Sequence, residues 1–284
     1  GYMSQKMLYS AQELHAAQKH KTVLIVDCRF ALSDTEKGYR DYLHAHIPGA
    51  VYAHLDDDLS SPVTSISGRH PLPEADRFAA FLARSGWQAG TTLIAYDDAG
   101  GFIAARLWWL MNYFGHGQAA LLDGGLQAWQ SAGYELEGGQ VKVNGAEPIM
   151  AEARGCLVVS TRDILEGVAG QSICLVDVRA AERFKGEVEP LDSVAGHIPG
   201  SVNFPFQLSL EPDGRFKPAT VIRKLLLDLT GSQQSEQLLF MCGSGVTACH
   251  AVFAAELAGL KGSKLYAGSW SEWIRDRSRP VEPA

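Results

Sequence analysis

The sequence has few cysteines, no excess of positive charge and no long apolar run, and each of these shortages excludes a class of protein. The five cysteines are scattered along 284 residues without a Cys-x-x-Cys pair, so the sequence predicts neither a disulfide framework nor a zinc site. The net charge of −7 disfavours a general nucleic-acid binder, which would carry a basic face. Residues 3–21 are polar and amphipathic, so we expect no signal peptide and no membrane span.

The chain has enough apolar material for more than one core. Hydrophobic residues make up 46% of its 284 positions, and a chain of this length most often forms two domains. Free cysteines suit a reduced compartment, so we expect a cytoplasmic protein.

Apolar strands alternate with helical patterns along the chain. Short apolar runs at residues 22–26, 92–96 and 119–122 predict buried strands, and the apolar spacing at 75–85 and 102–114 predicts helices. Strands that alternate with helices form a parallel sheet covered on both faces. The predicted fold class is therefore α/β.

The same series of blocks occurs twice, which predicts two copies of one domain. Four pairs of blocks match in order and spacing: 24–29 with 173–179, 45–51 with 196–202, 93–100 with 238–245, and 124–129 with 268–273. The stretch between the copies lacks clear periodicity and contains glycine and proline. We predict an N-terminal domain at 1–136, a linker at 137–158 and a C-terminal domain at 159–284.

One cysteine stands where a reactive group is expected. Residues 238–241 predict a buried strand, Cys242 follows it, and Gly243 and Gly245 lead into a helix predicted at 248–260. In an open α/β sheet, ligands bind at the carboxyl ends of the strands. Glycines let the loop curl so that backbone N–H groups point inward, and such dipoles favour a thiolate. We predict that Cys242 is a sulfur nucleophile.

The alternative for any cysteine is a packed core residue, since cysteine is among the most buried residue types. Cys28, Cys156 and Cys174 each neighbour an apolar run and are predicted to be of that kind, as is Cys249 inside the predicted helix. In the first copy, Asp97 occupies the position that corresponds to Cys242. Because an aspartate has no sulfur, only the C-terminal domain is predicted to be catalytic.

Two other functions share features with this loop. A cysteine-dependent phosphatase uses a similar strand, loop and helix, but it needs an arginine that closes the loop around phosphate. Ala248 stands near that position. A sulfur carrier or binding module without catalysis stays open as an alternative, since the first copy keeps the pattern without its cysteine.

The whole chain resembles the tandem rhodanese-type sulfurtransferases. The matching stretches are 177–179, 196–200, 242–248 and 268–273, and the first-copy blocks match the inactive domain of that family. The resemblance implies two tandem rhodanese-like domains, each a parallel sheet flanked by helices. The loop Cys-Gly-Ser-Gly-Val-Thr-Ala is similar to that of 3-mercaptopyruvate sulfurtransferases, whereas thiosulfate sulfurtransferases often have basic residues after the cysteine.

The resemblance implies an enzyme that moves a sulfane sulfur from a small anionic donor to an acceptor through a persulfide on Cys242. We expect 3-mercaptopyruvate as the donor, with thiosulfate as the alternative, because a dianion would gain from arginine or lysine in the loop. The acceptor is a small thiol, a thioredoxin-like protein or cyanide. No metal, organic cofactor, nucleic acid or membrane is implied.

The resemblance also implies which residues contact the donor. Arg183 matches an arginine that holds the donor's carboxylate, and its alternative is a surface arginine facing solvent. The loop residues expected to surround the sulfur are Gly243, Ser244, Gly245, Val246 and Thr247. Asp177 and Arg179 are predicted to form a structural pair under the sheet.

One position departs from the family. Mercaptopyruvate enzymes often carry a second substrate arginine in a Glu-Pro-Arg segment, and this chain has Leu191 there. Leucine cannot bind an anion, so Lys185 and Arg106 are the candidates to replace the missing arginine.

A histidine of the first domain assists the loop serine in that family. His46 matches the position of this histidine and Ser244 that of the serine. The acidic partner is left open among Asp34, Glu36 and Asp41. The alternative for His46 is a turn residue at the entry to a strand.

Overall fold

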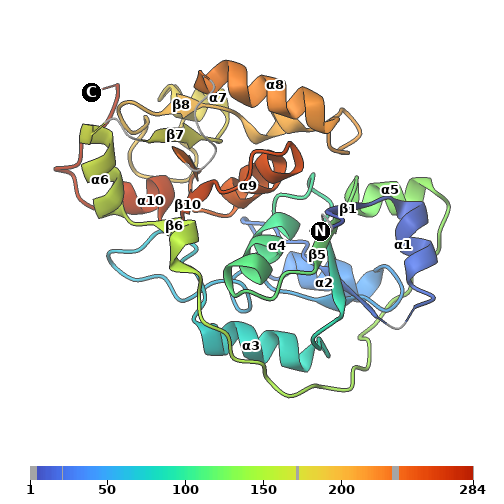
Figure 1. Ribbon diagram of the computed structural model, residues 1–284. Coiled ribbons are helices and arrows are strands. Elements are labelled where there is room, and N and C mark those ends of the chain that lie inside the picture. Colours follow the sequence, from blue (N-terminus) through green and yellow to red (C-terminus); the bar gives the residue numbers. More distant parts are fainter. Residues whose placement is uncertain (1–4, 21, 171–172, 232–236, 284) are drawn as a thin grey trace. The chain divides into compact units, whose positions relative to one another are not determined.

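The computed structural model describes residues 5–20, 22–170, 173–231 and 237–283. Three features of the predictions lie partly outside these ranges. They are the first limit of the N-terminal domain at residue 1, the last limit of the C-terminal domain at residue 284, and both ends of the polar stretch at 3–21. The elements labelled in Figure 1 are β1 (Leu8–Tyr9), α1 (Ala11–Ala17), β2 (Val23–Asp27), α2 (Lys37–His44), β3 (Val51–Tyr52), α3 (Ala75–Arg84), β4 (Thr92–Tyr96), α4 (Ala104–Tyr113), β5 (Ala119–Leu122), α5 (Gly125–Ser131), η1 (Gly155–Leu157), β6 (Val158–Val159), α6 (Thr161–Gly170), β7 (Cys174–Asp177), α7 (Ala181–Phe184), β8 (Val202–Asn203), η2 (Phe206–Ser209), α8 (Ala219–Thr230), β9 (Leu238–Met241), α9 (Thr247–Leu257), β10 (Lys264–Tyr266) and α10 (Ser269–Trp273).

The two halves of the chain form two sheets with the same topology. The strand orders are β1-β5-β4-β2-β3 and β6-β10-β9-β7-β8, so each strand of the first sheet has a counterpart five strands later. The described pairings between these strands are all parallel. The fold is α/β and the repeat predicted from the four pairs of blocks is confirmed.

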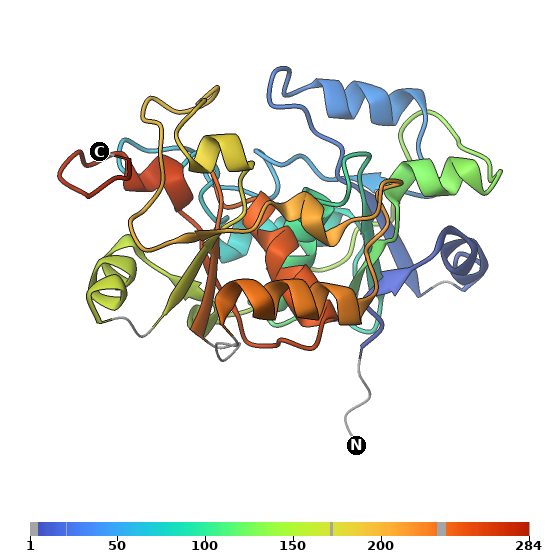
Figure 2. The same cartoon turned by 90° about the horizontal axis from the view of Figure 1, so that it is seen from above.

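The first sheet is covered on both faces. Strand side chains alternate between the faces, and Ile25, Ile94 and Tyr96 pack in one cluster with Leu14 of α1 and Trp129 of α5. Helix α4 lies against β4 and β5, on the other face of the sheet from α1 and α5 (Figures 1 and 2). The buried strands predicted at 92–96 and 119–122 are β4 and β5.

The second sheet has the same layers. Leu239 and Met241 of β9 pack in one cluster with Ile164 of α6 and with Trp270 and Trp273 of α10. Helix α9 lies against β9 and β10, with α8 alongside it. Figures 1 and 2 show α6 and α10 on one face of this sheet and α8 and α9 on the other.

Each compact unit includes a segment from the other half of the chain. Unit 1 consists of Gly1–Ser60, Pro73–Ala153 and Pro212–Phe216, and unit 2 of Ser61–Leu72, Arg154–Glu211 and Lys217–Ala284. The predicted division at 1–136, 137–158 and 159–284 does not include this exchange. Patterns along the chain reveal where elements begin and end, but not which core a loop packs against.

Two of the cysteines are less buried than predicted. Cys28 and Cys249 are buried, as expected, whereas Cys156 is exposed and Cys174 is half-buried. Cys156 lies in the short helix η1 just before β6, and the apolar run beside it belongs to that edge strand. Within the described ranges, none of the helices combines the length and the apolar character needed to cross a bilayer.

Candidate active site

Cys242 lies between β9 and α9, at the carboxyl end of a buried strand. Cys242 is 3% exposed. Its Sγ accepts hydrogen bonds from the backbone N–H groups of Gly245 at 3.1 Å and Ala248 at 3.3 Å. The N–H groups at a helix N-terminus carry partial positive charge, so they stabilise negative charge on the sulfur. The predicted strand, loop and helix are therefore present, with N–H groups aimed at the sulfur.

The glycine at position 245 is required by the backbone. Its φ is +89°, which disfavours any residue with a Cβ. A Cβ there would also collide with the carbonyl oxygen of Ala267, at the end of β10. Gly243 is different, because its φ is not positive.

The beginning of α10 fixes the backbone of the cysteine loop. The N–H of Cys242 donates to Ser269 Oγ at 3.1 Å, and the N–H of Trp270 donates to the carbonyl of Cys242 at 3.0 Å. The N–H of Ser271 donates to the carbonyl of Gly243 at 2.9 Å. These contacts explain why the block at 268–273 accompanies the cysteine loop in the sequence.

Arg183, on α7, extends over the cysteine loop. A Cβ added to Gly243 would lie 3.2 Å from Arg183 Nη2 and 3.6 Å from Nη1. Glu189 holds the guanidinium, accepting from Nε at 3.2 Å and from Nη2 at 3.1 Å. Burial raises the pKa of Glu189, but hydrogen bonds from Arg183 and from the N–H groups of Asp192 and Leu191 outweigh it, so the pKa lies below the ordinary 4.5.

Arg179 belongs to the support of the site. It donates to both carboxylate oxygens of Asp177, with Nη2 at 2.8 Å from Oδ2 and Nε at 3.1 Å from each oxygen. Its guanidinium carbon lies 4.9 Å from the centre of the Trp270 ring. Both side chains of the pair are almost completely buried. The predicted structural pair is confirmed.

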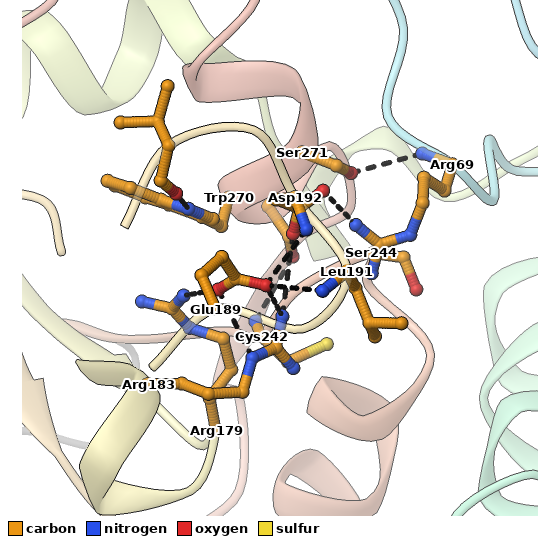
Figure 3. A network of polar contacts seen from close by, with 12 residues as sticks. Arg69, Arg179, Arg183, Glu189, Leu191, Asp192, Cys242, Ser244, Trp270 and Ser271 are labelled. Atoms are coloured by element: carbon orange, nitrogen blue, oxygen red, sulfur yellow. Dashed lines mark hydrogen bonds and ion pairs between the residues drawn. The ribbon is translucent and has the colours of Figure 1, made fainter. Parts of the chain in front are cut away.

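The residues 61–72 bring two side chains to the site that the sequence reasoning missed. Nδ1 of His70 lies 2.8 Å from Ser244 Oγ, and both residues are buried. Arg69 forms an ion pair with Asp192, and its N–H donates to Ser271 Oγ at 3.0 Å. Figure 3 shows Arg69, Asp192, Ser244 and Cys242 together. Nothing in the local pattern signalled this, although an arginine-histidine pair inside a Ser- and Pro-rich loop was visible.

The structure does not have His46 as the partner of Ser244. His46 is fully buried in unit 1, with Nδ1 2.9 Å from the carbonyl of Ile47 and Nε2 2.7 Å from that of Gly139. Its repeat counterpart His197 likewise contacts a carbonyl, that of Phe184, at 2.7 Å. The histidine of this block is thus part of the turn in both copies, which fits the alternative reading of His46.

The candidate acids for His46 have other partners within unit 1. Asp34 pairs with Arg40, Glu36 with His54, and Asp41 with Lys37. Of the two candidates for the missing arginine, Arg106 belongs to unit 1 and Lys185 to unit 2. Arg106 is fully buried in unit 1 and donates to the carbonyl of Leu59, and Lys185 is an exposed residue at the end of α7.

Asp97 of unit 1 shows what the same loop does without sulfur. Its carboxylate accepts four backbone N–H groups at 2.9–3.0 Å, from Ala99, Gly101, Ile103 and Ala104. Burial raises the pKa of Asp97 above the ordinary 3.8, and these four hydrogen bonds oppose that rise. The side chain therefore fills its own anion-binding loop.

The remaining predicted loop residues lie at the start of α9. Val246 is buried and precedes the helix, and Thr247 is its first residue and is half-buried. In the part of the chain that is described, no three side chains of His, Cys, Asp or Glu are grouped so that they could hold a metal ion.

A parallel α/β sheet with a cysteine in an N–H-lined loop defines a sulfur- or phosphate-transfer class of site. The Rhodanese-like domain model matches residues 10–132 and 160–276, and the chain belongs to this family. A probable 3-mercaptopyruvate sulfurtransferase of Pseudomonas aeruginosa is 42% identical over 98% of this chain and 99% of its own length. A putative thiosulfate sulfurtransferase of Mycobacterium tuberculosis is 38% identical, over 97% of this chain and 96% of its own.

Solved structures agree with the sequence relatives. A 3-mercaptopyruvate sulfurtransferase from Leishmania major superposes with a TM-score of 0.83 at 29% identity, over 95% of this chain and 75% of that chain. The fold is thus a tandem of two rhodanese domains. Because its full-length relatives are sulfurtransferases, the chain is an enzyme of the sulfurtransferase type.

Proposed function

We propose that this protein takes the thiol sulfur of 3-mercaptopyruvate onto Cys242, where it becomes the sulfane sulfur of a persulfide, and passes it to a thiol or to cyanide. The observation that carries the proposal is the position of Cys242 Sγ, 3.1 and 3.3 Å from two backbone N–H groups. These donors stabilise both the attacking thiolate and the persulfide that replaces it. The mercaptopyruvate names of several relatives support the choice of donor.

The first half-reaction makes one sulfur–sulfur bond and breaks one carbon–sulfur bond. The Cys242 thiolate attacks the thiol sulfur of 3-mercaptopyruvate, and the electrons of the C–S bond stay on the carbon, giving the enolate of pyruvate. A proton then converts the enolate to pyruvate. We assign the delivery of this proton to the Ser244 hydroxyl, which shares a hydrogen bond with His70 at 2.8 Å.

The second half-reaction returns Cys242 to its thiolate form. An acceptor thiolate attacks the outer sulfur of the persulfide, and Cys242 leaves as a thiolate stabilised by the same N–H groups. A small thiol, a thioredoxin-like protein and cyanide are the acceptors considered. A cytoplasmic setting stays a prediction based on the free cysteines.

The test of the nucleophile is a pair of cysteine substitutions. After incubation with 3-mercaptopyruvate, mass spectrometry of the native protein is expected to show one added sulfur atom on Cys242, with release of pyruvate. Cys242→Ser should lose both signals, because a hydroxyl is not ionised at neutral pH. Cys249→Ser should keep most of the activity, because that sulfur is buried and donates to the carbonyl of Gly245 at 3.4 Å. Turnover by the Cys242→Ser protein would refute the proposal.

Thiosulfate is the second candidate donor, and one observation favours it. The loop itself has no cation, as the sequence indicated, but the guanidinium groups of Arg69 and Arg183 both lie over Gly243, and a dianion gains from such charges. Steady-state rates with both donors, measured side by side at equal ionic strength, separate the two. A higher kcat/KM for thiosulfate would make it the donor.

A further inference from the structure

We propose that Arg69 is the second cation of the donor site, beside Arg183. The inference rests on the proposed function, because it concerns the anionic group of the donor that Cys242 attacks. It assigns to residues 61–72, from the first half of the chain, a part in substrate recognition by the catalytic unit.

The first observation is the convergence of two guanidinium groups beside the cysteine. A Cβ at Gly243 would lie 2.9 Å from Arg69 Nη2 and 3.2 Å from Arg183 Nη2. Arg69 and Arg183 therefore approach the same residue, the one that follows Cys242. An anion held there by both guanidinium groups would present its sulfur next to the Cys242 thiolate.

The second observation is the distribution of the ion pairs. Asp192 bridges the two arginines, with Oδ1 paired to Arg69 Nη1 and Oδ2 3.4 Å from Arg183 Nη2. Figure 3 shows Asp192 between them. Among the described residues, Arg69 Nη2 and Arg183 Nη1 have no hydrogen-bond partner, and both lie near Gly243. These N–H groups can therefore donate hydrogen bonds to the anionic group of the sulfur donor.

The third observation is that Arg69 is fixed, unlike a surface arginine. Its side chain is 26% exposed, compared with 86% for Arg162. Its backbone N–H is bound by Ser271, and the preceding Gly68 packs so closely that a Cβ there would lie 2.5 Å from the carbonyl oxygen of Gly268. A pre-positioned guanidinium loses little side-chain entropy on binding an anion.

Leu191 contributes a backbone N–H group to the site. The N–H of Leu191 donates to Glu189 Oε2 at 2.9 Å and so helps to hold the carboxylate that binds Arg183. Its side chain is 48% exposed and apolar. A cation is therefore supplied from residue 69 at a site where residue 191 cannot supply one.

The experiment compares alkylation of Cys242 by iodoacetate, an anion, and by iodoacetamide, its neutral analogue. Both reagents form a thioether and release iodide, so neither requires sulfur transfer. Peptide mapping measures the alkylation of Cys242 separately from that of the other cysteines. In the native protein we expect iodoacetate to be favoured relative to a free thiol. Arg69→Ala should lower the ratio of the iodoacetate rate to the iodoacetamide rate roughly tenfold, because loss of one charge-assisted hydrogen bond has an effect of about this size. The iodoacetamide rate itself should not change.

Three further variants complete the test. Arg162→Ala removes the same charge from an exposed position of unit 2 and should leave the ratio unchanged. Arg69→Ala should raise the KM for 3-mercaptopyruvate roughly 10- to 100-fold and leave discharge of a preformed persulfide unchanged. Adding Leu191→Arg to that variant should recover a large part of the loss.

Two results would overturn the inference. One is an Arg69→Ala protein whose iodoacetate-to-iodoacetamide rate ratio and KM for 3-mercaptopyruvate both stay within twofold of the native values. The other is an equal fall in both alkylation rates, because it would mean that Arg69 only supports the loop. If the native protein shows the alkylation preference but forms no persulfide from 3-mercaptopyruvate, the proposed function fails while the anion site stands.

Discussion

At the scale of single residues, the donor site is a balance of charges that lie very close together. Two guanidinium groups, those of Arg69 and Arg183, face two carboxylates, those of Glu189 and Asp192. All four side chains are at most 26% exposed, so water screens them weakly. The four charges therefore cancel, and the proposed donor anion would meet the two arginine edges that lie near Gly243.

This balance predicts the effect of removing one carboxylate charge. Asp192→Asn keeps the size of the side chain and leaves one more positive charge beside Cys242. A dianion gains more than a monoanion from this, so the kcat/KM ratio of thiosulfate to 3-mercaptopyruvate should rise several-fold, up to about tenfold. Asp228→Asn, in an exposed pair on α8, is the matched control. An unchanged ratio of the two kcat/KM values in Asp192→Asn would contradict the electrostatic account.

The pKa of Glu189 predicts how stability depends on pH. Its pKa is lower in the folded protein than the ordinary 4.5, so the charged carboxylate stabilises the fold above that pH and the contribution is lost as pH falls through the folded pKa. The free energy of unfolding, from urea titrations, should therefore be lower for Glu189→Gln than for the native protein at pH 7. The difference should shrink as pH falls below about 4.5. A constant or growing difference would be the opposite result.

At the scale of elements, one strand, loop and helix occurs twice with two different acceptors. In unit 2 the N–H groups bind a sulfur, and in unit 1 four of them bind the Asp97 carboxylate. The loop needs a negative or strongly accepting atom at its centre in either case, because buried N–H groups without a partner are costly. In the first copy, which has no sulfur at this position, Asp97 thus supplies the acceptor that these N–H groups need.

Removing that acceptor should destabilise the first unit. Asp97→Ala leaves four N–H groups without this partner, and those of Ile103 and Ala104 are buried. At about 1–3 kcal/mol for each buried group, the free energy of unfolding should fall by roughly 2–6 kcal/mol. Asp97→Asn should cost less, since one amide oxygen still accepts. Asp98→Ala, at an exposed neighbour, should change little. Urea titrations that gave equal values for Asp97→Ala and Asp98→Ala would contradict this role.

At the scale of the whole molecule, the catalytic unit depends on residues from the other half of the chain. Residues 61–72 belong to unit 2 and bring Arg69 and His70 to the cysteine loop. A loop on the surface tolerates this exchange because it carries no core of its own. The first half of the chain therefore contributes side chains to the candidate site, although its own loop holds Asp97.

This dependence predicts that a change far from the cysteine in sequence weakens donor binding. In Gly68→Ala the new Cβ would lie 2.5 Å from the carbonyl oxygen of Gly268 and 3.0 Å from Ser271 Oγ, so residues 61–72 must shift and carry Arg69 and His70 with them. We expect the KM for the donor to rise roughly tenfold with little change in urea stability. Ile66→Ala, at a 77% exposed side chain of the same segment, is the control and should behave as the native protein. Unchanged kinetics in Gly68→Ala would show that the segment does not position the site.

The two α/β copies, the strand, loop and helix around Cys242, and the structural pair of Asp177 and Arg179 could all be predicted from the amino-acid sequence. Each of these depends on residues close together in the chain, where apolar period, glycines and spacing report local structure directly. The tertiary structure alone decided that Arg69 and His70 reach the site, because these contacts join residues 123 and 174 positions apart. Such contacts depend on which core a loop packs against. The sequence favours His46 instead of His70 because His46 lies in a block that the chain repeats, whereas His70 lies in a loop without a repeated pattern.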